Sequence, residues 1–195
     1  MKKIRFDDCI CQGNIPEHKE IRSTLLSLIA ETQSNSLVWN NPYYSDSISR
    51  LDFDESEDFN RPWVKKFVEV WETPLKEMMM SMGYTGMQLF KCWFQQYKQQ
   101  DTHGWHIHGS HFTGVYYLEF PSKSAKTEVV SPYSGKVKKV GVKEGDFIIF
   151  PAHWIHRAPP NTSERKTIIS WNFDAIQDSI NLLQQFRKIC SVIPG

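Results

Sequence analysis

Short segments rich in aromatic and β-branched residues follow one another through the second half of the chain. They constrain the fold more than any other feature. Turn-forming residues separate these segments, as they do between the strands of an antiparallel sheet. Six or more strands of this kind predict a β-sandwich or a β-barrel. The expected strands are residues 87–99, 111–120, 127–130, 136–142, 146–150 and 166–173.

After a short N-terminal strand, the first 85 residues predict a helical layer that supports the barrel. Apolar residues after Pro16 recur at helical spacing, so one face of that segment must be buried. A second helix is expected from Asn60, a candidate cap, and Pro62, which suits a first helical turn. The apolar faces are Ile21, Leu25, Leu28 and Ile29 in the first helix, and Val64, Phe67, Val68, Trp71, Leu75, Met78, Met79 and Met82 in the second.

Two further segments complete what we expect to be a single domain of 195 residues. Residues 35–59 are rich in Ser, Asn, Asp and Pro, which predicts a loop with at most a short strand near 49–53. A loop of that length is a candidate lid over the barrel mouth. Asp174 is a candidate cap for a final helix. The expected divisions are helical support and lid over 1–85, the β core over 86–173 and a C-terminal helix over 174–195.

The amino-acid composition limits the kinds of molecule that this protein is expected to bind. Lys and Arg total 23 against 22 for Asp and Glu, so a formal net charge of +1 provides no general attraction to nucleic acid or anionic lipid. No apolar run approaches the roughly 20 residues that span a bilayer, and the charged start of the chain does not resemble a signal peptide. We therefore expect a soluble, cytoplasmic protein with a small-molecule or peptide substrate and without a membrane or nucleic-acid partner. No pattern specifies the substrate or the oligomeric state.

Histidines are concentrated in the expected β core, where six of the seven lie between positions 103 and 156. Imidazole is the commonest metal-binding side chain and titrates near neutrality, so this cluster favours metal or acid–base chemistry. His106 and His108 are two residues apart, which places both on one face of a strand. His156, which follows the expected strand 146–150, is the candidate third ligand from a distant strand. The remaining members, His103, His111 and His153, are more readily explained as structural residues.

A second candidate group follows nine residues after His156. In a strand, Arg165 and Thr167 project from the same face. A guanidinium fork and a hydroxyl donor together suit a carboxylate. The alternative is an arginine in a polar surface turn.

Four ordered segments resemble the Fe(II)/2-oxoglutarate-dependent oxygenases, above all a small branch found in bacteria and their phages. They carry a His-x-His pair, a Gly-Val-Tyr-Tyr strand, and a Phe-Pro pair followed by a distal histidine. The resemblance implies a double-stranded β-helix, which is a jelly-roll or cupin-like barrel with the metal in its mouth and helices outside. It covers roughly residues 60–175, through 105–110, 113–118, 145–151 and 156–173.

The resemblance also implies roles for individual residues. His106 and His156 match iron ligands, and Arg165 and Thr167 match the pair that binds the distal carboxylate of 2-oxoglutarate. His108 stands where most of the superfamily has Asp or Glu. We favour a three-histidine site, because His-x-His belongs to this branch; the alternative carboxylate ligands are Asp101, Glu128 and Asp146. Further expected contacts of the cosubstrate pocket are Tyr97, Tyr117 or its neighbour Tyr116, and Trp171.

By this resemblance, the protein uses Fe(II), 2-oxoglutarate and O2 to hydroxylate an unknown substrate, with release of succinate and CO2. One alternative is a three-histidine, cupin-like metal dioxygenase that does not use 2-oxoglutarate. A second is a non-catalytic binding protein that keeps the barrel as a scaffold. A zinc hydrolase is a weaker alternative, because three histidines and a water would suffice for the metal but no general base is evident beside them.

Overall fold

The computed structural model describes residues 10–41 and 45–177. Its strands form one antiparallel sheet, in the order β1-β9-β6-β11-β4-β3-β5-β10-β7-β8, with β2 paired to β3. The strands are β1 (Cys11–Asn14), β2 (Asn35–Asn40), β3 (Ser45–Leu51), β4 (Gly86–Lys98), β5 (Thr102–His106), β6 (Phe112–Glu119), β7 (Glu128–Val130), β8 (Val137–Lys139), β9 (Asp146–Pro151), β10 (His156–Ala158) and β11 (Arg165–Ile176).

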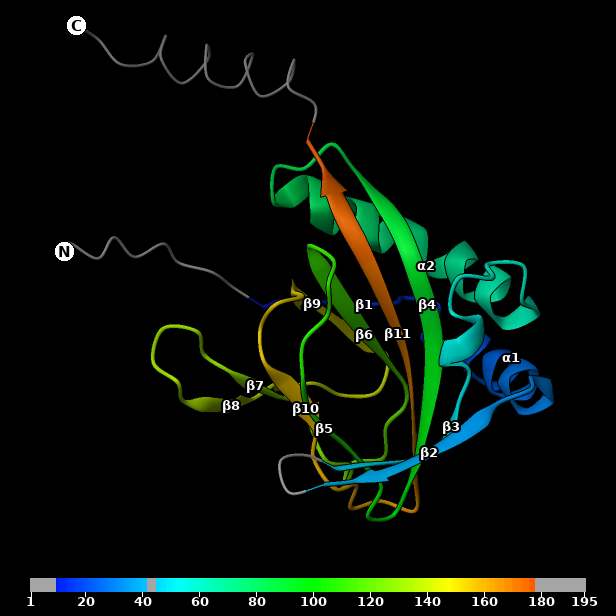
Figure 1. Cartoon of the computed structure of the whole chain (residues 1–195). Coiled ribbons are helices and arrows are strands. Elements are labelled where there is room, and N and C mark those ends of the chain that lie inside the picture. The colour runs from blue at the N-terminus through cyan, green and yellow to red at the C-terminus, as the bar shows by residue number, and fades with distance from the viewer. Residues whose placement is uncertain (1–9, 42–44, 178–195) are drawn as a thin grey trace, which may run out of the picture.

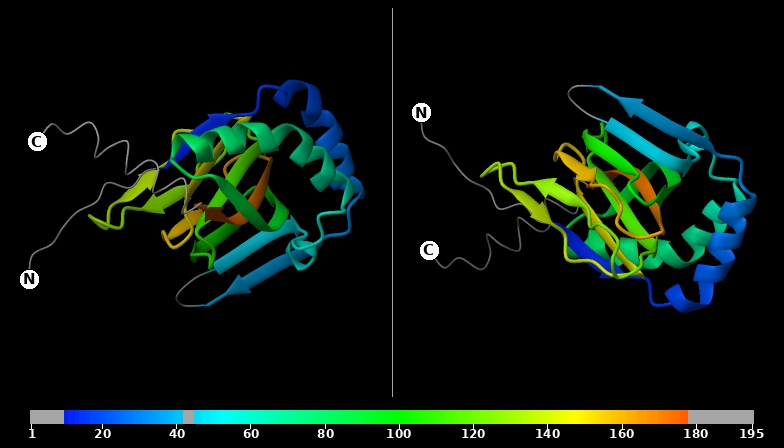
Figure 2. Two further views of the ribbon diagram at one scale, coloured as in Figure 1. Left: turned by 90° about the horizontal axis from the view of Figure 1, so that it is seen from above. Right: turned by 90° about the horizontal axis from the view of Figure 1, so that it is seen from below.

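The sheet curls around an interior, with α2 (Pro62–Ser81) on one side and the β2–β3 hairpin on the opposite side (Figure 2). The other helix is α1 (His18–Glu31), and a short 3-10 turn, η1, covers Phe53–Glu55. This architecture confirms the expected jelly-roll fold with helices packed outside. Among the described residues, no helix is long and apolar enough to cross a membrane.

Apolar side chains of the central strands point alternately to the two faces of the sheet and form two apolar cores, one on each face. On the helix-facing side, Phe67 and Trp71 of α2 pack against Tyr116 of β6 and Trp171 of β11. Trp171 lies so close to Gly114 that a Cβ added there would be 2.1 Å from its Cε2 atom. The second core fills the curled interior and contains Ile48, Tyr97, Val115, Tyr117, Phe120, Val129, Val140, Val142, Ile148, Phe150, Trp154, Ala158 and Ile168.

β11 lies at the centre of this arrangement, between β4 and β6 (Figure 1). Its residues 167, 169 and 171 face the helices, and residues 166, 168, 170 and 172 face the interior, because successive side chains of a strand alternate. Which residues of β11 point inward therefore decides which of its side chains can contact a ligand inside the barrel.

Two details of the expected organisation differ. The segment expected to be a loop contains the hairpin β2–β3, and β3 joins the sheet beside β4 and β5. β2 is largely exposed, so its sequence lacks the alternation that marks a half-buried strand. β11 continues through Ile176, so the first residues of the expected C-terminal helix belong to a strand, and the rest of that helix lies outside the described residues.

Candidate active site

The three histidines named as metal ligands converge in the structure. His106 ends β5, His156 begins β10, and the two residues are partners in the ladder between these strands. His108 follows in the loop after β5, where its backbone N–H donates to the carbonyl of Ala152 at 2.9 Å. One ligand atom from each ring lies within 4.8 Å of the other two. A single ion can therefore be reached by all three rings.

Backbone carbonyls fix the tautomers of two of these rings. Nδ1 of His106 lies 2.7 Å from the carbonyl oxygen of Gly104, and Nδ1 of His156 lies 2.8 Å from that of Trp154. A carbonyl oxygen only accepts, so both rings carry their proton on Nδ1 and have their lone pair on Nε2. Neutral imidazole with a hydrogen-bonded second nitrogen is the form that binds metals in proteins.

Burial keeps these imidazoles neutral. Desolvation, followed by the charge of neighbouring histidines, lowers the pKa of His108 and of His156 to about 3. Burial also lowers the pKa of His106. His103, which stacks on His106 at a centroid distance of 3.8 Å, has its pKa lowered to about 2 by burial and by the neighbouring imidazoles. The cluster is thus ready for a cation near neutral pH without first losing protons.

Beside the histidines, the interior faces of three long strands line a pocket. Tyr97 of β4 lies in this lining, and its hydroxyl is buried without a hydrogen-bond partner among the described residues. Tyr117 of β6 lies in the interior core and its hydroxyl is 2.8 Å from Oγ1 of Thr127. The remaining lining residues are Trp93, Gln95, His103, Thr113, Val115, Thr127, Arg157, Ala158, Ile168 and Ser170.

Lys166 is the basic residue on the interior face of β11, and the sequence reasoning overlooked it. Only 2% of the residue is exposed, and its ammonium lies 4.5 Å from the centre of the Tyr97 ring and 3.3 Å from the Ala125 carbonyl oxygen. No carboxylate of the described residues forms an ion pair with it, and burial lowers its pKa to about 8. A buried cation and a free phenol group therefore adjoin the pocket.

The residues expected to bind the distal carboxylate lie on the other face of β11. Both Nε and Nη2 of Arg165 donate to the Glu119 carboxylate at 2.7 Å, and half of the arginine side chain is exposed. Thr167 is buried and donates to the same carboxylate at 2.8 Å. Trp171 is part of the helix-facing core, 4.9 Å from the ring of Trp71. The structure does not bring these three side chains to the histidines. They occupy the odd-numbered positions of β11, which face away from the interior.

The alternative carboxylate ligands also lie apart from the cluster. Asp101 accepts hydrogen bonds from Ser47, Ser49 and the Lys98 backbone. Glu128 pairs with Arg157, and Asp146 accepts from Gln12. In residues 10–41 and 45–177, the one group of histidine, cysteine and acidic residues placed to hold a metal consists of the three histidines.

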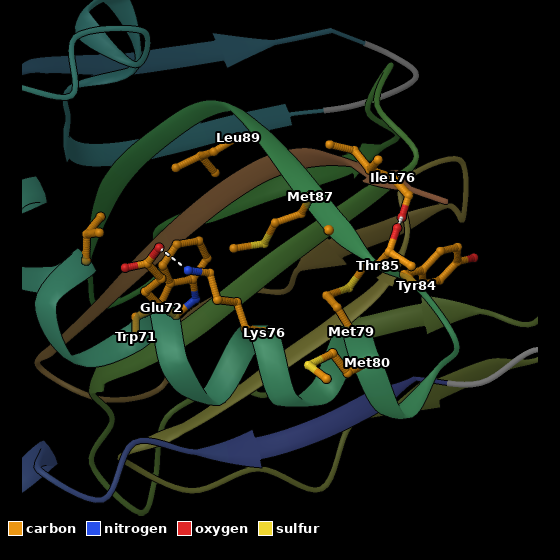
Figure 3. Close-up of a pocket in the computed structure, with 12 residues that line it drawn as sticks. Trp71, Glu72, Lys76, Met79, Met80, Tyr84, Thr85, Met87, Leu89 and Ile176 are labelled. Carbon is orange, nitrogen blue, oxygen red and sulfur yellow. Dashed lines mark hydrogen bonds and ion pairs between the residues drawn. The ribbon is translucent and has the colours of Figure 1, made fainter. Parts of the chain in front are cut away.

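A larger apolar groove of about 400 Å³ lies between α2 and the ends of β4 and β11 (Figure 3). Its charged side chains, Glu72 and Lys76, pair with each other at 2.6 Å. No histidine or cysteine lines it. The chemistry of the smaller pocket, rather than the size of this groove, identifies the candidate site.

Comparison with known proteins relates the chain to others by structure only, since no family model and no curated protein matches its sequence. A 2OG-Fe(II) oxygenase family oxidoreductase from Burkholderia pseudomallei superposes with a TM-score of 0.65 at 11% identity, over 84% of each chain. A prolyl-4-hydroxylase from Pseudomonas putida gives a TM-score of 0.60 at 12% identity, over 88% of this chain and 94% of that one.

A third similar structure is SnoK, a non-haem alpha-ketoglutarate-dependent carbocyclase from nogalamycin biosynthesis. It gives a TM-score of 0.65 at 9% identity, over 91% of this chain and 86% of that one. Identities this low establish the architecture alone. The chain has the fold of the 2OG-Fe(II) oxygenases.

Proposed function

We propose that this protein is an Fe(II)- and 2-oxoglutarate-dependent oxygenase that hydroxylates an unidentified substrate and releases succinate and CO2. The observation that carries the proposal is the convergence of three imidazoles on a pocket whose wall includes Tyr97, against which a buried lysine packs, inside a barrel with the fold of such oxygenases.

The donor set fits iron. Imidazole nitrogen suits Fe(II), Zn(II), Cu(II) and Ni(II), and the common non-haem iron site uses three protein ligands and leaves the other positions open. His106, His108 and His156 would hold the metal here. Three neutral ligands leave the complex one charge more positive than two histidines and a carboxylate would, which favours an anionic cosubstrate.

The pocket also fits a dicarboxylate. Lys166 is a buried ammonium without a carboxylate partner among the described residues, and the Tyr97 hydroxyl is a buried donor without an acceptor. A carboxylate placed between them would satisfy both groups. We therefore assign the binding of the distal carboxylate of 2-oxoglutarate to Lys166 and Tyr97, in place of Arg165 and Thr167. Tyr117 supports this wall through its hydrogen bond to Thr127.

When bound, the metal and 2-oxoglutarate supply the activation of O2 and the oxidising power. The chain contributes orientation and a dry environment. Lys166 and Tyr97 would hold the far end of the cosubstrate, while the three histidines would hold the metal. Trp93, Val115 and Ile168 form apolar walls that limit the access of water.

Anaerobic reconstitution tests this proposal. The protein is loaded with Fe(II), O2 is admitted with 2-oxoglutarate, and succinate is measured without added substrate. We expect slow succinate formation that disappears in His156→Ala, with His153→Ala as the matched control. Metal binding without any binding of 2-oxoglutarate would instead indicate a cupin-like dioxygenase. Absence of metal binding would leave the scaffold interpretation.

A further inference from the structure

The third histidine of the cluster differs from the other two in what its second nitrogen meets. Nδ1 of His106 and of His156 faces a backbone carbonyl, but Nδ1 of His108 lies 3.4 Å from the side-chain amide nitrogen of Asn172. We propose that Asn172 is a positioning residue, which reorients its amide so that His108 can present Nε2 to the metal ion. This inference rests on the proposed metal site and concerns how that site accepts its ion.

The surroundings fix the backbone position of both residues. Asn172 is 6% exposed and lies on the interior face of β11, two residues beyond Ser170 of the pocket lining. The ring of His108 is held by the hydrogen bond of its backbone to Ala152 and by Trp93, at a centroid distance of 5.8 Å. The amide can turn about its Cβ–Cγ bond while the imidazole keeps its position.

In the structure, the amide presents its donor to His108. A nitrogen that accepts cannot carry a proton, so the proton of neutral His108 is on Nε2. Nε2 of His108 lies 3.2 Å from Nε2 of His156, whose own proton is on Nδ1 and which can therefore accept. The proton on Nε2 of His108 and its hydrogen bond to Nε2 of His156 occupy positions that a metal ion requires.

Metal binding requires the other tautomer of His108. The ring must then carry its proton on Nδ1 and needs an acceptor there. The Oδ1 atom of Asn172 is buried without a hydrogen-bond partner among the described residues. A half-turn of the amide brings this oxygen to Nδ1, because the two ends of an amide have the same shape. Asparagine can serve both tautomers, whereas aspartate serves only the metal-binding one and leucine serves neither.

Two substitutions of similar shape test this role. Asn172→Asp should make His108 carry its proton on Nδ1 even without metal, and Asn172→Leu should remove the acceptor. Loss of such a partner typically lowers metal affinity by about 10- to 100-fold. We expect that loss for Leu and an affinity equal to or above that of the wild type for Asp. Asn40→Leu, the same change on the exposed strand β2, is the matched control.

The tautomer is read from the ¹⁵N shifts of the His108 ring by NMR, and affinity is read from Zn(II) titration by calorimetry. The wild type should change from Nε2–H to Nδ1–H when Zn(II) binds. Equal Zn(II) affinity of the Leu variant and the wild type would overturn the inference. So would an identical metal-free tautomer in the Asp variant and the wild type. A wild type that binds no metal would refute the proposed function instead, and the metal-free tautomers would still decide the role of Asn172.

Discussion

Replacing Lys166 by methionine tests which face of β11 binds 2-oxoglutarate, the interior face with Lys166 or the opposite face with Arg165. Methionine keeps most of the length of the buried stem and removes the charge. A hydrogen bond to a charged group contributes about 1.5–3 kcal/mol, and each 1.4 kcal/mol is a factor of ten in affinity. The Lys166→Met change should therefore weaken 2-oxoglutarate binding by about 10- to 150-fold. Arg165→Met, the neighbouring change on the opposite face, should alter it by less than about threefold.

The same variant should be more stable than the wild type. Burial lowers the pKa of Lys166 to about 8 in the folded protein, from 10.5 in the unfolded chain. Between these values the unfolded chain binds more protons, so the wild-type free energy of unfolding rises with pH through this window and is lowest below it. Removing a buried ammonium without a carboxylate partner should therefore raise the melting temperature at pH 7 and abolish this pH dependence. A loss of binding could then not be attributed to unfolding.

The affinity for 2-oxoglutarate should also depend on pH in the wild type but not in Lys166→Met. A carboxylate binds the protonated ammonium, so 2-oxoglutarate affinity should fall as pH rises above about 8. Calorimetric titration of Zn(II)-loaded protein measures binding without turnover, and thermal unfolding gives the stability. The reasoning would be refuted if Arg165→Met abolished binding while Lys166→Met bound 2-oxoglutarate as tightly as the wild type.

Three further substitutions test the packing that positions the site. Gly114→Ala should cost at least about 1–3 kcal/mol, because its Cβ would overlap the buried Trp171 ring, and denaturant titration would measure the loss. Asp52→Ala should cost about 3–5 kcal/mol by the same method, because it leaves the buried Arg61 without its ion-pair partner. Burial alone would raise the pKa of Asp101, but hydrogen bonds from Ser49, Ser47 and Lys98 lower it. Asp101 should therefore contribute stability that is lost as pH falls through that lowered value, and Asp101→Ala should unfold with a weaker dependence on acid.

Much of the architecture follows from local patterns. Long strands such as β4, β6 and β9 were expected nearly at their observed bounds, because their aromatic and β-branched residues favour extended backbone. Although His106 and His156 were expected on strands, the bounds of the short strands β5 and β10 were not predicted. They have five and three residues and owe their place to pairing with each other across the barrel, which no local pattern records.

The candidate site divides in the same way. The sequence by itself determined which three imidazoles would be available, but it expected His106 and His108 on one strand face, whereas β5 ends at His106 and His108 lies in the following loop. It could not determine which face of β11 meets them. That strand is buried on both sides, with Ile168 facing the interior and Ile169 facing the helices. Apolar residues therefore occur at successive positions, and the sequence does not show which of them face the interior. Pairing with β4 and β6 sets the phase, turns Arg165 outward and places Lys166 and Asn172 inside. Tertiary structure decided this point because a shift of one residue exchanges the two faces of a strand.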